Sequence, residues 1–351
     1  MSLASRQDPI CYLRKQAGKD DPVRVVVLAG GVGGARFLLG VRAVLQEQAA
    51  QQDPVAEHQL QVLVNTGDDL TVHGLRVCPD LDTVMYTLGD GIDSARGWGR
   101  RAESWQAKEE LAAYGAEPSW FGLGDRDIAT HLVRTRMLDA GFPLSEVTAA
   151  LCERWQLSSP AILVQLLPMS DQRVETHVIC EIEGVRRVVH FQEWWIAHHA
   201  NPPVEEFVSV GLDDATPGPG VLEAISAADA VLLAPSNPVV IIGPILALPD
   251  IGEALRDSPA KIVGVSPIVD GAVIRGMADR CLPAVGVPVT AEGVGNHYGA
   301  RKAGGILDGW LVHETDAAEV PGVEVRMIPL LMRSPEATAA IARSALDLCR
   351  G

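Results

Sequence analysis

The feature of this sequence that most constrains its fold is a short β-branched run, residues 23–28, that leads directly into a turn of glycines. The turn reads Ala29-Gly30-Gly31-Val32-Gly33-Gly34. From Ala35 onward, apolar residues recur at helical spacing. A strand, a glycine turn and a helix in this order are how a doubly wound α/β domain begins. We therefore expect parallel strands joined by helical crossovers, with ligands held at the carboxyl ends of the strands.

The alternation of strands and helices returns in the second half of the chain. Strand patterns occur at residues 230–234, 261–265 and 306–312, and a closing helix is expected at residues 335–348. The fold class predicted is α/β, with a Rossmann-like, doubly wound, mostly parallel sheet.

The predicted sheet is interrupted by a segment of different texture. Helical patterns dominate residues 101–155, and one hairpin is expected from residues 176–182 and 185–191. We therefore predict a core built from residues 23–90 and 216–351. Residues 91–215 are predicted to be a mainly helical inserted subdomain, and residues 1–22 a polar N-terminal extension.

The chain is acidic: its 351 residues include 29 Lys and Arg against 45 Asp and Glu, a formal net charge of −16. Nucleic acids and anionic membranes attract clustered positive charge, so we expect neither as a partner. An acidic protein that binds an anionic substrate usually needs a metal ion, a helix N-terminus or backbone amides. Six scattered cysteines and the lack of a signal-peptide pattern predict reduced thiols and a cytoplasmic location.

The glycine turn does not match the dinucleotide fingerprint. Counted from Gly31 and Gly33, the third small residue would fall at position 36, which is Arg36. No Gly-Lys-Ser or Gly-Lys-Thr phosphate loop follows. What remains is an amide-rich turn at a helix N-terminus, which suits an anion. The alternative is that the turn serves only close packing of strand and helix.

Carboxylates gather after the second predicted strand. Asp68 and Asp69 follow its end, and Asp80 and Asp82 come shortly afterwards, with His73 between the two pairs. Clustered oxygen ligands without cysteine suit Mg²⁺, which is often shared with substrate phosphates. His73 is a candidate donor to a phosphate. The alternative is that Asp80 and Asp82 begin a helix while Asp69 faces solvent.

Two later strands end in loops of similar character, Pro235-Ser236-Asn237-Pro238 and Ser266-Pro267. Their prolines fix rigid turns, while the Ser and Asn side chains can bind a nucleotide or phosphate, or satisfy their own backbone. Arg126, at a predicted helix start, is a candidate anion ligand. The run at 190–195 is aromatic enough to wall a flat ligand, or to pack a domain edge. No signature of a nucleophilic Ser or Cys occurs, so we expect a metal-assisted reaction on a phosphorylated substrate.

Taken together in chain order, six segments resemble the 2-phospho-L-lactate transferase family of coenzyme F420 biosynthesis, most closely its actinobacterial phosphoenolpyruvyl transferases. They are GGVGGAR at 30–36, NTGDD at 65–69, CPDLDT at 78–83, LGDRD at 123–127, HFQ at 190–192 and APSNP at 234–238. The resemblance extends from about residue 23 to the C-terminus.

The resemblance implies a Mg²⁺-dependent transferase. Its acceptor would be the deazaflavin Fo, and its donor a guanosine diphosphate that carries a phosphoenolpyruvyl or 2-phospho-L-lactyl group. The terminal ribityl hydroxyl of Fo would attack the phosphorus next to the three-carbon acid, and GMP would leave. The family also implies a homodimer. Which of the two donors is used stays open, because they differ by a single unsaturation.

The resemblance assigns roles by position. Asp68 matches the catalytic or metal aspartate, with Asp69 as a second metal ligand, and Asp82 matches a deazaflavin contact. The remaining candidates for binding the cofactor and nucleotide are Asp80, Thr66, His73, Gly30, Gly31, Gly33, Gly34, Ser236, Asn237, Pro238, Ser266 and Arg126.

One position departs from the family pattern, and two other functions compete. Many members have Arg or Lys where this chain has Gly122, so another residue, with Arg126 as the candidate, must supply that contact. A nucleotide-sugar-binding regulator with a related core is the main alternative, although it has no need of the segment at 78–83. A nicotinamide dehydrogenase is disfavoured by the broken fingerprint.

Overall fold

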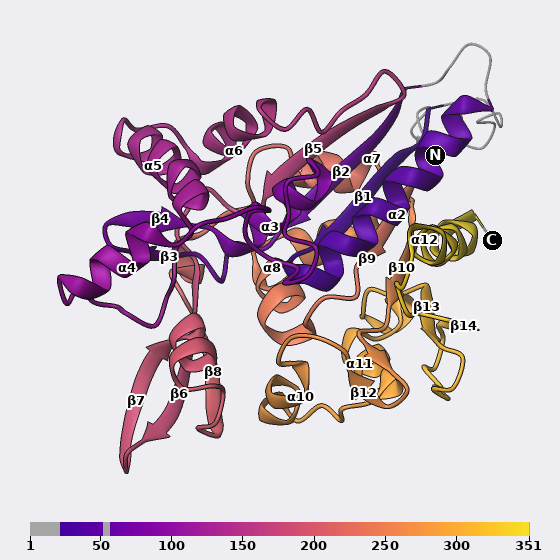
Figure 1. Ribbon diagram of the computed structural model, residues 1–351. Helices are drawn as coiled ribbons and strands as arrows, with labels where there is room; N and C mark the ends of the chain where they lie inside the picture. Colours follow the sequence, from indigo (N-terminus) through magenta and orange to yellow (C-terminus); the bar gives the residue numbers. More distant parts are fainter. Residues whose placement is uncertain (1–21, 52–56, 351) are drawn as a thin grey trace, which may run out of the picture.

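The computed structural model describes residues 22–51 and 57–350, and its centre is a seven-stranded sheet whose neighbouring strands are all parallel (Figure 1). The predicted N-terminal extension lies outside the described residues except for its last position. The strands, in spatial order, are β14 (Glu324–Ile328), β13 (Gly309–His313), β10 (Lys261–Val265), β9 (Ala230–Leu233), β1 (Arg24–Ala29), β2 (His58–Val64) and β5 (Ile162–Pro168). The predicted α/β, doubly wound fold is confirmed.

The chain builds this sheet outward from β1 in both directions. Strands β2 and β5 lie on one side of β1, and β9, β10, β13 and β14 lie on the other. The order therefore reverses between β1 and β9. In open parallel sheets, such a switch point opens a crevice at the carboxyl ends of the strands, where ligands bind.

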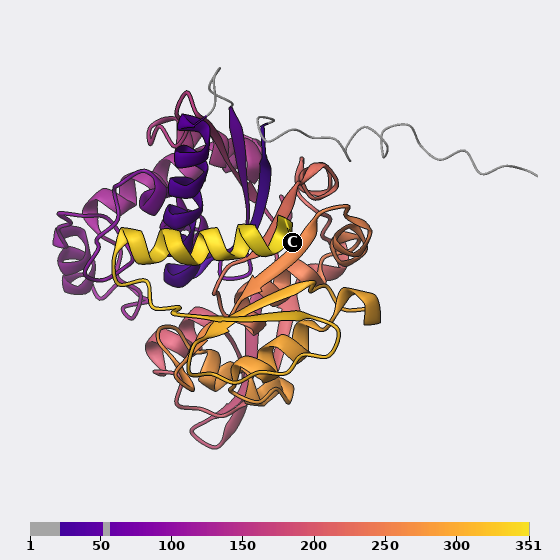
Figure 2. The same ribbon diagram turned by 90° about the vertical axis from the view of Figure 1, so that its right-hand side faces the viewer.

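Both faces of the sheet are covered by helices, as the residues of β1 show. Val25 and Val27 point into one apolar layer and Val26 and Leu28 into the other, because successive side chains in a strand face opposite ways. The first layer is closed by α2 (Gly31–Ala50), α3 (Pro79–Leu88), α6 (Leu144–Glu153) and α12 (Pro335–Arg350). The second is closed by α7 (Val221–Ala227), α8 (Gly243–Ala247), α9 (Ile251–Asp257) and α11 (Ala291–Tyr298). Figure 2 shows α12 lying across α2 at the end of the chain.

The segment predicted as an insert contributes to the main sheet. Strand β5 lies inside residues 91–215, yet it pairs with β2 along its whole length. Its sequence, ILVQLLP, is a nearly continuous apolar run typical of a strand, so the signal was present and was not used. The division into core and insert stays a prediction, but its boundary must leave β5 with the core sheet.

The rest of that segment contains the expected helices and hairpin. It contains α4 (Gln106–Ala113), α5 (Asp125–Asp139) and the expected hairpin of β6 (Glu175–Ile182) and β7 (Val185–His190). An unpredicted strand, β8 (Val204–Val210), completes a three-stranded antiparallel sheet that projects at the lower left of Figure 1. Two short hairpins are also present, β3 (Leu70–Val72) with β4 (Leu75–Val77) and β11 (Ile268–Val269) with β12 (Ala272–Val273), together with helix α10 (Ala278–Cys281).

Within the described residues, no single helix is long and apolar enough to cross a membrane. The helical segments Pro238–Ala247 and Ile251–Asp257 reach that length only as a pair, and they are bent by 85°.

Candidate functional site

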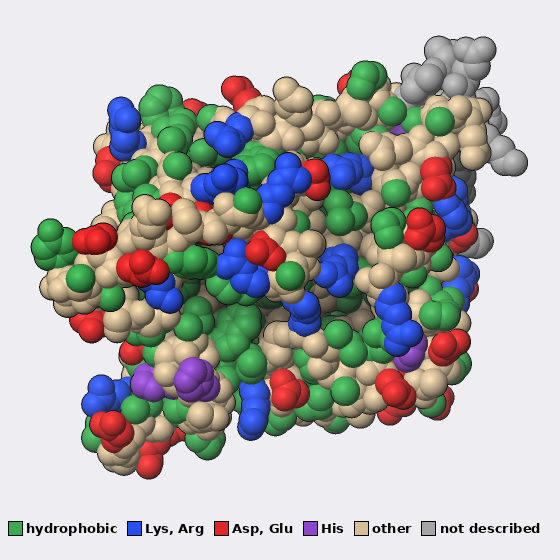
Figure 3. Space-filling model, in the orientation of Figure 1, with side chains coloured by type: hydrophobic (Ala, Val, Ile, Leu, Met, Phe, Trp, Pro, Cys, Tyr) green, Lys and Arg blue, Asp and Glu red, His purple; other side chains and the backbone are tan. Residues whose placement is uncertain are grey.

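A single large pocket, of about 1400 Å³, occupies the crevice predicted by the strand order. The loops that follow β1, β2, β9 and β10 all contribute to its wall, through Gly30, Asp68, Ser236 and Ser266. Figure 3 shows Lys and Arg side chains gathered around a hollow near the centre of this face. The sequence-based expectation that chemistry lies in the loops at the strand ends agrees with this geometry.

The glycine turn after β1 forms one side of the pocket and is held by Asp80. Gly31 has φ of +65°, a conformation that side chains other than glycine's rarely adopt, and its N–H donates to Asp80 Oδ1 over 2.7 Å. A Cβ on Gly30 would overlap the Asp80 carboxylate. Helix α2 starts at Gly31, four residues before the predicted start at Ala35, so the glycines form its first turn.

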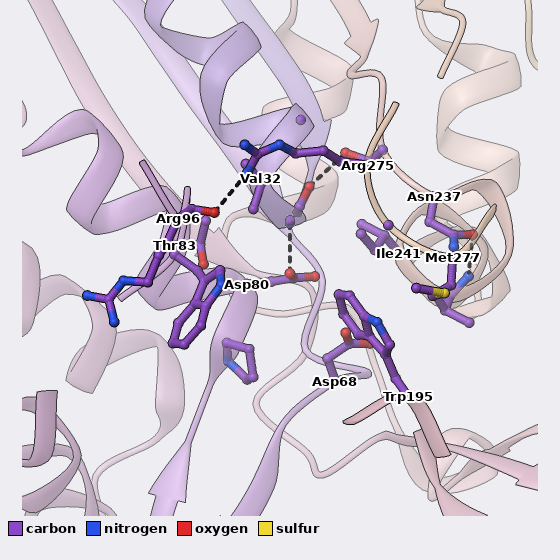
Figure 4. A pocket seen from close by; sticks show the side chains of 18 of the residues that line it. Val32, Asp68, Asp80, Thr83, Arg96, Trp195, Asn237, Ile241, Arg275 and Met277 are labelled. Carbon is purple, nitrogen blue, oxygen red and sulfur yellow. Dashed lines mark hydrogen bonds between the residues drawn. The ribbon is translucent and has the colours of Figure 1, made fainter. Parts of the chain in front are cut away.

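Asn65, at the end of β2, joins two carboxylates that face the pocket. Its amide Nδ2 donates to Asp80 Oδ2 over 2.9 Å and lies 3.4 Å from Asp68 Oδ1. The other Asp68 oxygen, Oδ2, accepts from Gln192 Nε2 over 3.0 Å. Figure 4 shows Asp68 and Asp80 at the pocket wall, with Trp195 beside Asp68. Neither the asparagine nor the glutamine was among the predicted site residues.

The two carboxylates carry negative charge that no basic side chain neutralises. Among the residues described, neither Asp68 nor Asp80 forms an ion pair with Lys, Arg or His. Burial, followed by the charges of Asp80 and Asp69, raises the pKa of Asp68 well above its ordinary value. Burial also raises the pKa of Asp80 to about 6. Two buried carboxylates without a basic partner fit the oxygen-ligand chemistry of Mg²⁺.

The structure places two predicted site residues, Asp69 and Asp82, off the pocket wall. The Asp69 carboxylate is fully buried 3.6 Å from the Arg76 guanidinium, and burial raises its pKa to about 7. Asp82 accepts two hydrogen bonds from Arg134. Residues two apart on a helix face nearly opposite directions. Because Asp80 faces the pocket, Asp82 points away from it. We therefore replace Asp69 by Asp80 in the candidate cation site, and withdraw Asp82 as a ligand contact.

Three residues of the later loops line the pocket, and their side chains also form hydrogen bonds with backbone groups. Ser236 Oγ donates to the Gly30 carbonyl over 2.8 Å, which ties the β9 loop to the glycine turn. Asn237 Oδ1 accepts from Val239 N over 2.9 Å, and Ser266 Oγ accepts from Ile268 N. The self-satisfying turn that the sequence left open is therefore present at Asn237 and Ser266, and the binding of a nucleotide or phosphate stays a prediction.

The other predicted residues lie near the pocket without forming part of its wall. Gly34, Thr66 and Pro238 are buried behind it. His73 lines a small neighbouring cavity. Arg126 is exposed, and its guanidinium donates to the Arg101 carbonyl over 3.3 Å.

A cation nevertheless stands at Gly122, where the family pattern has Arg or Lys. A Cβ on Gly122 would lie 3.2 Å from Lys108 Nζ, which comes from α4 and lines the same pocket. Lys108, rather than Arg126, therefore supplies the basic group at this position. Sequence spacing could not show this, because the two residues meet only through the fold.

The largest part of the pocket that sequence reasoning missed is its aromatic and basic rim. The Arg96 guanidinium lies 5.0 Å from the Trp98 ring and 5.2 Å from the Trp105 ring. Arg275, from the opposite wall, donates to the Arg96 carbonyl over 2.8 Å and so spans the pocket (Figure 4). Further lining side chains of the same two kinds are Arg36, Lys108, Trp120, Phe121, Trp195 and Arg333.

The aromatic run at 190–195 was expected either to wall a ligand or to pack a domain edge, and its residues divide between pocket lining and apolar packing. Trp194 is buried in a small apolar cluster with Phe191, whereas Trp195 lines the pocket. The tryptophans between residues 98 and 120 could have indicated the aromatic wall of the pocket, but they were not among the predicted site residues.

The fold and pocket together define an α/β protein with a basic and aromatic ligand pocket at the switch point of its sheet. The model of the family described as 2-phospho-L-lactate transferase CofD matches residues 25–324. This chain belongs to that family, and the resemblance found in its motifs is confirmed.

Full-length relatives and solved structures agree with this assignment. The chain is 61% identical over 328 residues to a phosphoenolpyruvate transferase of Nocardia farcinica, covering 93% of this chain and 94% of that protein. It is 58% identical to the phosphoenolpyruvate transferase of Mycolicibacterium smegmatis, covering 93% and 98%. A Bacillus halodurans crystal structure, 17% identical with a TM-score of 0.57, covers 93% of this chain and 99% of that one. A second crystal structure from that organism, of a upf0052 family member, has a TM-score of 0.55 at 16% identity, with the same coverage, and these likenesses establish the fold alone.

Membership of the family makes the chain an enzyme. It transfers a phosphoenolpyruvyl or phospholactyl type of group in coenzyme F420 biosynthesis. The alternative of a non-enzymatic nucleotide-sugar-binding regulator is thereby set aside.

Proposed function

We propose that this enzyme moves a phosphoenolpyruvyl group from a guanosine diphosphate conjugate to the terminal ribityl hydroxyl of the deazaflavin Fo. A new bond forms between the hydroxyl oxygen and the phosphorus next to the three-carbon acid. The anhydride bond to the other phosphorus breaks, and GMP leaves with the bonding electron pair. We favour the phosphoenolpyruvyl over the 2-phospho-L-lactyl donor because the similar proteins from Nocardia and Mycolicibacterium are named phosphoenolpyruvate transferases.

The observation that carries this proposal is one pocket large enough for two substrates. Its volume of about 1400 Å³ exceeds the roughly 300–1,000 Å³ of an ordinary single-ligand site. The glycine turn and the two carboxylates contribute to one continuous wall of it. A donor and an acceptor bound side by side would bring their reacting atoms to this wall, as transfer between two bound molecules requires.

The charges of the pocket suit a diphosphate donor. Its rim carries Arg36, Arg96, Lys108, Arg275 and Arg333, although the chain as a whole is strongly acidic. The N-terminal end of α2, which borders the pocket, adds to the attraction for an anion. Asp68 and Asp80 would hold Mg²⁺, which when bound neutralises charge on the diphosphate. We assign Asp68 as the carboxylate that accepts the proton of the attacking hydroxyl.

The aromatic rim suits a flat acceptor ring. Trp98, Trp105, Trp120 and Trp195 all line the pocket, and indole rings offer broad apolar faces for stacking. A deazaflavin bound against them would leave its ribityl chain free to reach the carboxylates. The homodimer and the cytoplasmic location stay predictions.

The direct test incubates purified enzyme, Fo and Mg²⁺ with each of the two guanylated donors in parallel, and follows the deazaflavin by mass spectrometry. We expect Fo to gain the phosphoenolpyruvyl group with release of GMP. Product from the phospholactyl donor alone would keep the transferase and change the donor. No product from either donor, with folded protein, would refute the proposal, and NADH binding at micromolar concentration would then revive a dehydrogenase.

A further inference from the structure

A sealed cluster of charged side chains lies behind the pocket wall, between α3 and α5. Arg134, which is 1% exposed, donates through Nη1 to Asp82 Oδ2 over 3.0 Å and through Nη2 to Asp82 Oδ1. Its Nη1 also lies 3.1 Å from His131 Nδ1 and 3.4 Å from the Arg76 carbonyl. Removing a guanidinium from water costs free energy that an ion pair often does not fully offset. The burial of Arg134 therefore calls for an explanation.

This cluster is not a metal site, although its ligand types resemble one. One ligand atom each of Asp82, Asp127 and His131 lies within 4.8 Å of the others. Both Asp82 oxygens, however, already accept hydrogen bonds from Arg134, whose positive charge would repel a cation. Asp127 Oδ1 likewise accepts from the Tyr86 hydroxyl over 2.6 Å. Among the residues that the structure describes, His131 Nε2 and Arg134 Nε are buried without a hydrogen-bond partner, but the guanidinium charge disfavours a cation among these side chains.

Its contacts tie α3 to α5, while separate contacts tie α3 to α2. Arg134 and Asp127 of α5 hold Asp82 and Tyr86 of α3. On the other side, Asp80 of α3 accepts from Gly31 N of α2. In Figure 1, α3 lies between these two helices. The first turn of α3 is therefore fixed from two directions, and Asp80 and Asp82 are the residues that transmit the two constraints.

We propose that Arg134 is a positioning residue for the transfer reaction. Because it donates to both oxygens of Asp82, it fixes the rotation of the first turn of α3. The Asp80 carboxylate is thereby kept in contact with the glycine turn and directed toward Asp68. The chain of contacts is Arg134 to Asp82, two residues along the helix to Asp80, and then to Gly31 and Asn65. The inference rests on the proposed function in one respect, that Asp80 serves as a cation ligand.

This two-point contact with the Asp82 carboxylate requires arginine in particular. Its planar fork places two N–H groups on one carboxylate, whereas the ammonium of lysine is a single point charge on a flexible stem. Arg134→Lys therefore keeps the buried charge but loses the fixed geometry. Arg136→Lys makes the same exchange two residues away on α5, where the side chain is exposed, and is a matched control.

The test compares wild type, Arg134→Lys and Arg136→Lys by thermal melting, by steady-state transfer kinetics, and by Mn²⁺ affinity measured from the electron paramagnetic resonance signal of free Mn²⁺. We expect Arg134→Lys to lower kcat by about 10- to 100-fold while the KM for Fo changes little. Its Mn²⁺ dissociation constant should rise about tenfold, as for the loss of a group that orients a metal ligand. Arg136→Lys should match wild type in all three measurements.

The outcomes separate this inference from the proposed function. A wild type that binds Mn²⁺ but transfers nothing would refute the function, while the Mn²⁺ comparison would still decide the role of Arg134. An Arg134→Lys enzyme with a lower melting temperature but unchanged kcat and Mn²⁺ affinity would overturn the inference, because Arg134 would then be only structural. A wild type that binds no Mn²⁺ would overturn it as well.

Discussion

Helix α3 carries two buried aspartates, two residues apart, that differ in what they face and in the charge of their partners. Asp80 faces a large pocket and is held only by an amide N–H and an asparagine side chain. Asp82 faces a sealed layer and is held by a buried arginine. The comparison teaches that the residue type does not decide whether a carboxylate does chemistry. A carboxylate left without a positive partner is available to a ligand, whereas a neutralised one stabilises the scaffold.

The largest expected effect belongs to the pocket side of this comparison. Asp68→Asn should leave the fold intact and lower transfer activity by at least about 100-fold, because it removes a charge at the reaction centre without breaking an ion pair. Activity assays at saturating Mg²⁺ and a melting curve measure the two quantities. Substantial Mg²⁺-dependent turnover in this variant would remove Asp68 from the mechanism.

Substitution of Asp82 should instead lower the stability of the fold. Asp82→Asn leaves the Arg134 guanidinium buried without its counter-charge, so it should lower the free energy of unfolding by roughly 3–5 kcal/mol. Circular dichroism melts of this variant beside Asp68→Asn give the contrast. Equal stability of the two variants would contradict the distinction between the unpaired carboxylates of the pocket and the ion-paired Asp82.

The same distinction predicts a dependence of stability on pH and Mg²⁺. The pKa of Asp80, about 6, and that of Asp69, about 7, lie above the ordinary value of about 4, so the folded chain binds protons more tightly than the unfolded chain. With a chelator present, the free energy of unfolding should therefore fall as pH rises from about 4 to 7. Mg²⁺ should stabilise the protein more at pH 7.5 than at pH 5.5, because the ionised carboxylate binds it.

Asp80→Asn separates this effect from the general repulsion of an acidic chain. In that variant the fall with pH should be shallower and the gain from Mg²⁺ much smaller. A wild-type stability that rises with pH across this range would contradict the assignment of Asp80 as an unpaired, buried carboxylate.

The smallest effect is expected at the β9 loop. Ser236→Ala removes the hydrogen bond to the Gly30 carbonyl, and it should raise the KM for the guanylated donor about three- to tenfold with a lesser change in kcat. Steady-state kinetics with varied donor measures both constants. A fall in kcat at unchanged KM would place this loop in the chemistry instead of in donor binding.

The sequence could predict much of the fold because the signals involved are local. The run at 23–28, the glycines after it and the apolar spacing in the closing helix each determine their own element, and parallel pairing then brings the loops at the strand ends together. Asp68, Asp80 and Ser236 were found in this way. Strand β5 was not predicted, although its sequence ILVQLLP carries a local apolar run of the same kind.

The parts of the site that sequence missed depend on contacts between distant segments. Asn65 and Gln192 are ordinary polar residues until the fold brings them to Asp68, and Lys108 reaches Gly122 only through the packing of α4. The ion pair of Asp82 was not predicted for the same reason, since nothing near Asp82 in the sequence indicates that Arg134 will lie 3.0 Å away.

The most direct test of the central claim is the position of a bound cation. Crystals grown with Mn²⁺ and GDP, measured near the manganese absorption edge, should give an anomalous peak in contact with both Asp68 and Asp80, and no peak within the cluster of Asp82 and His131. A peak at Asp69 or at Asp82 would contradict the division of the carboxylates into pocket and scaffold. A well-ordered GDP with no peak beside Asp68 and Asp80 would contradict their assignment as the cation site.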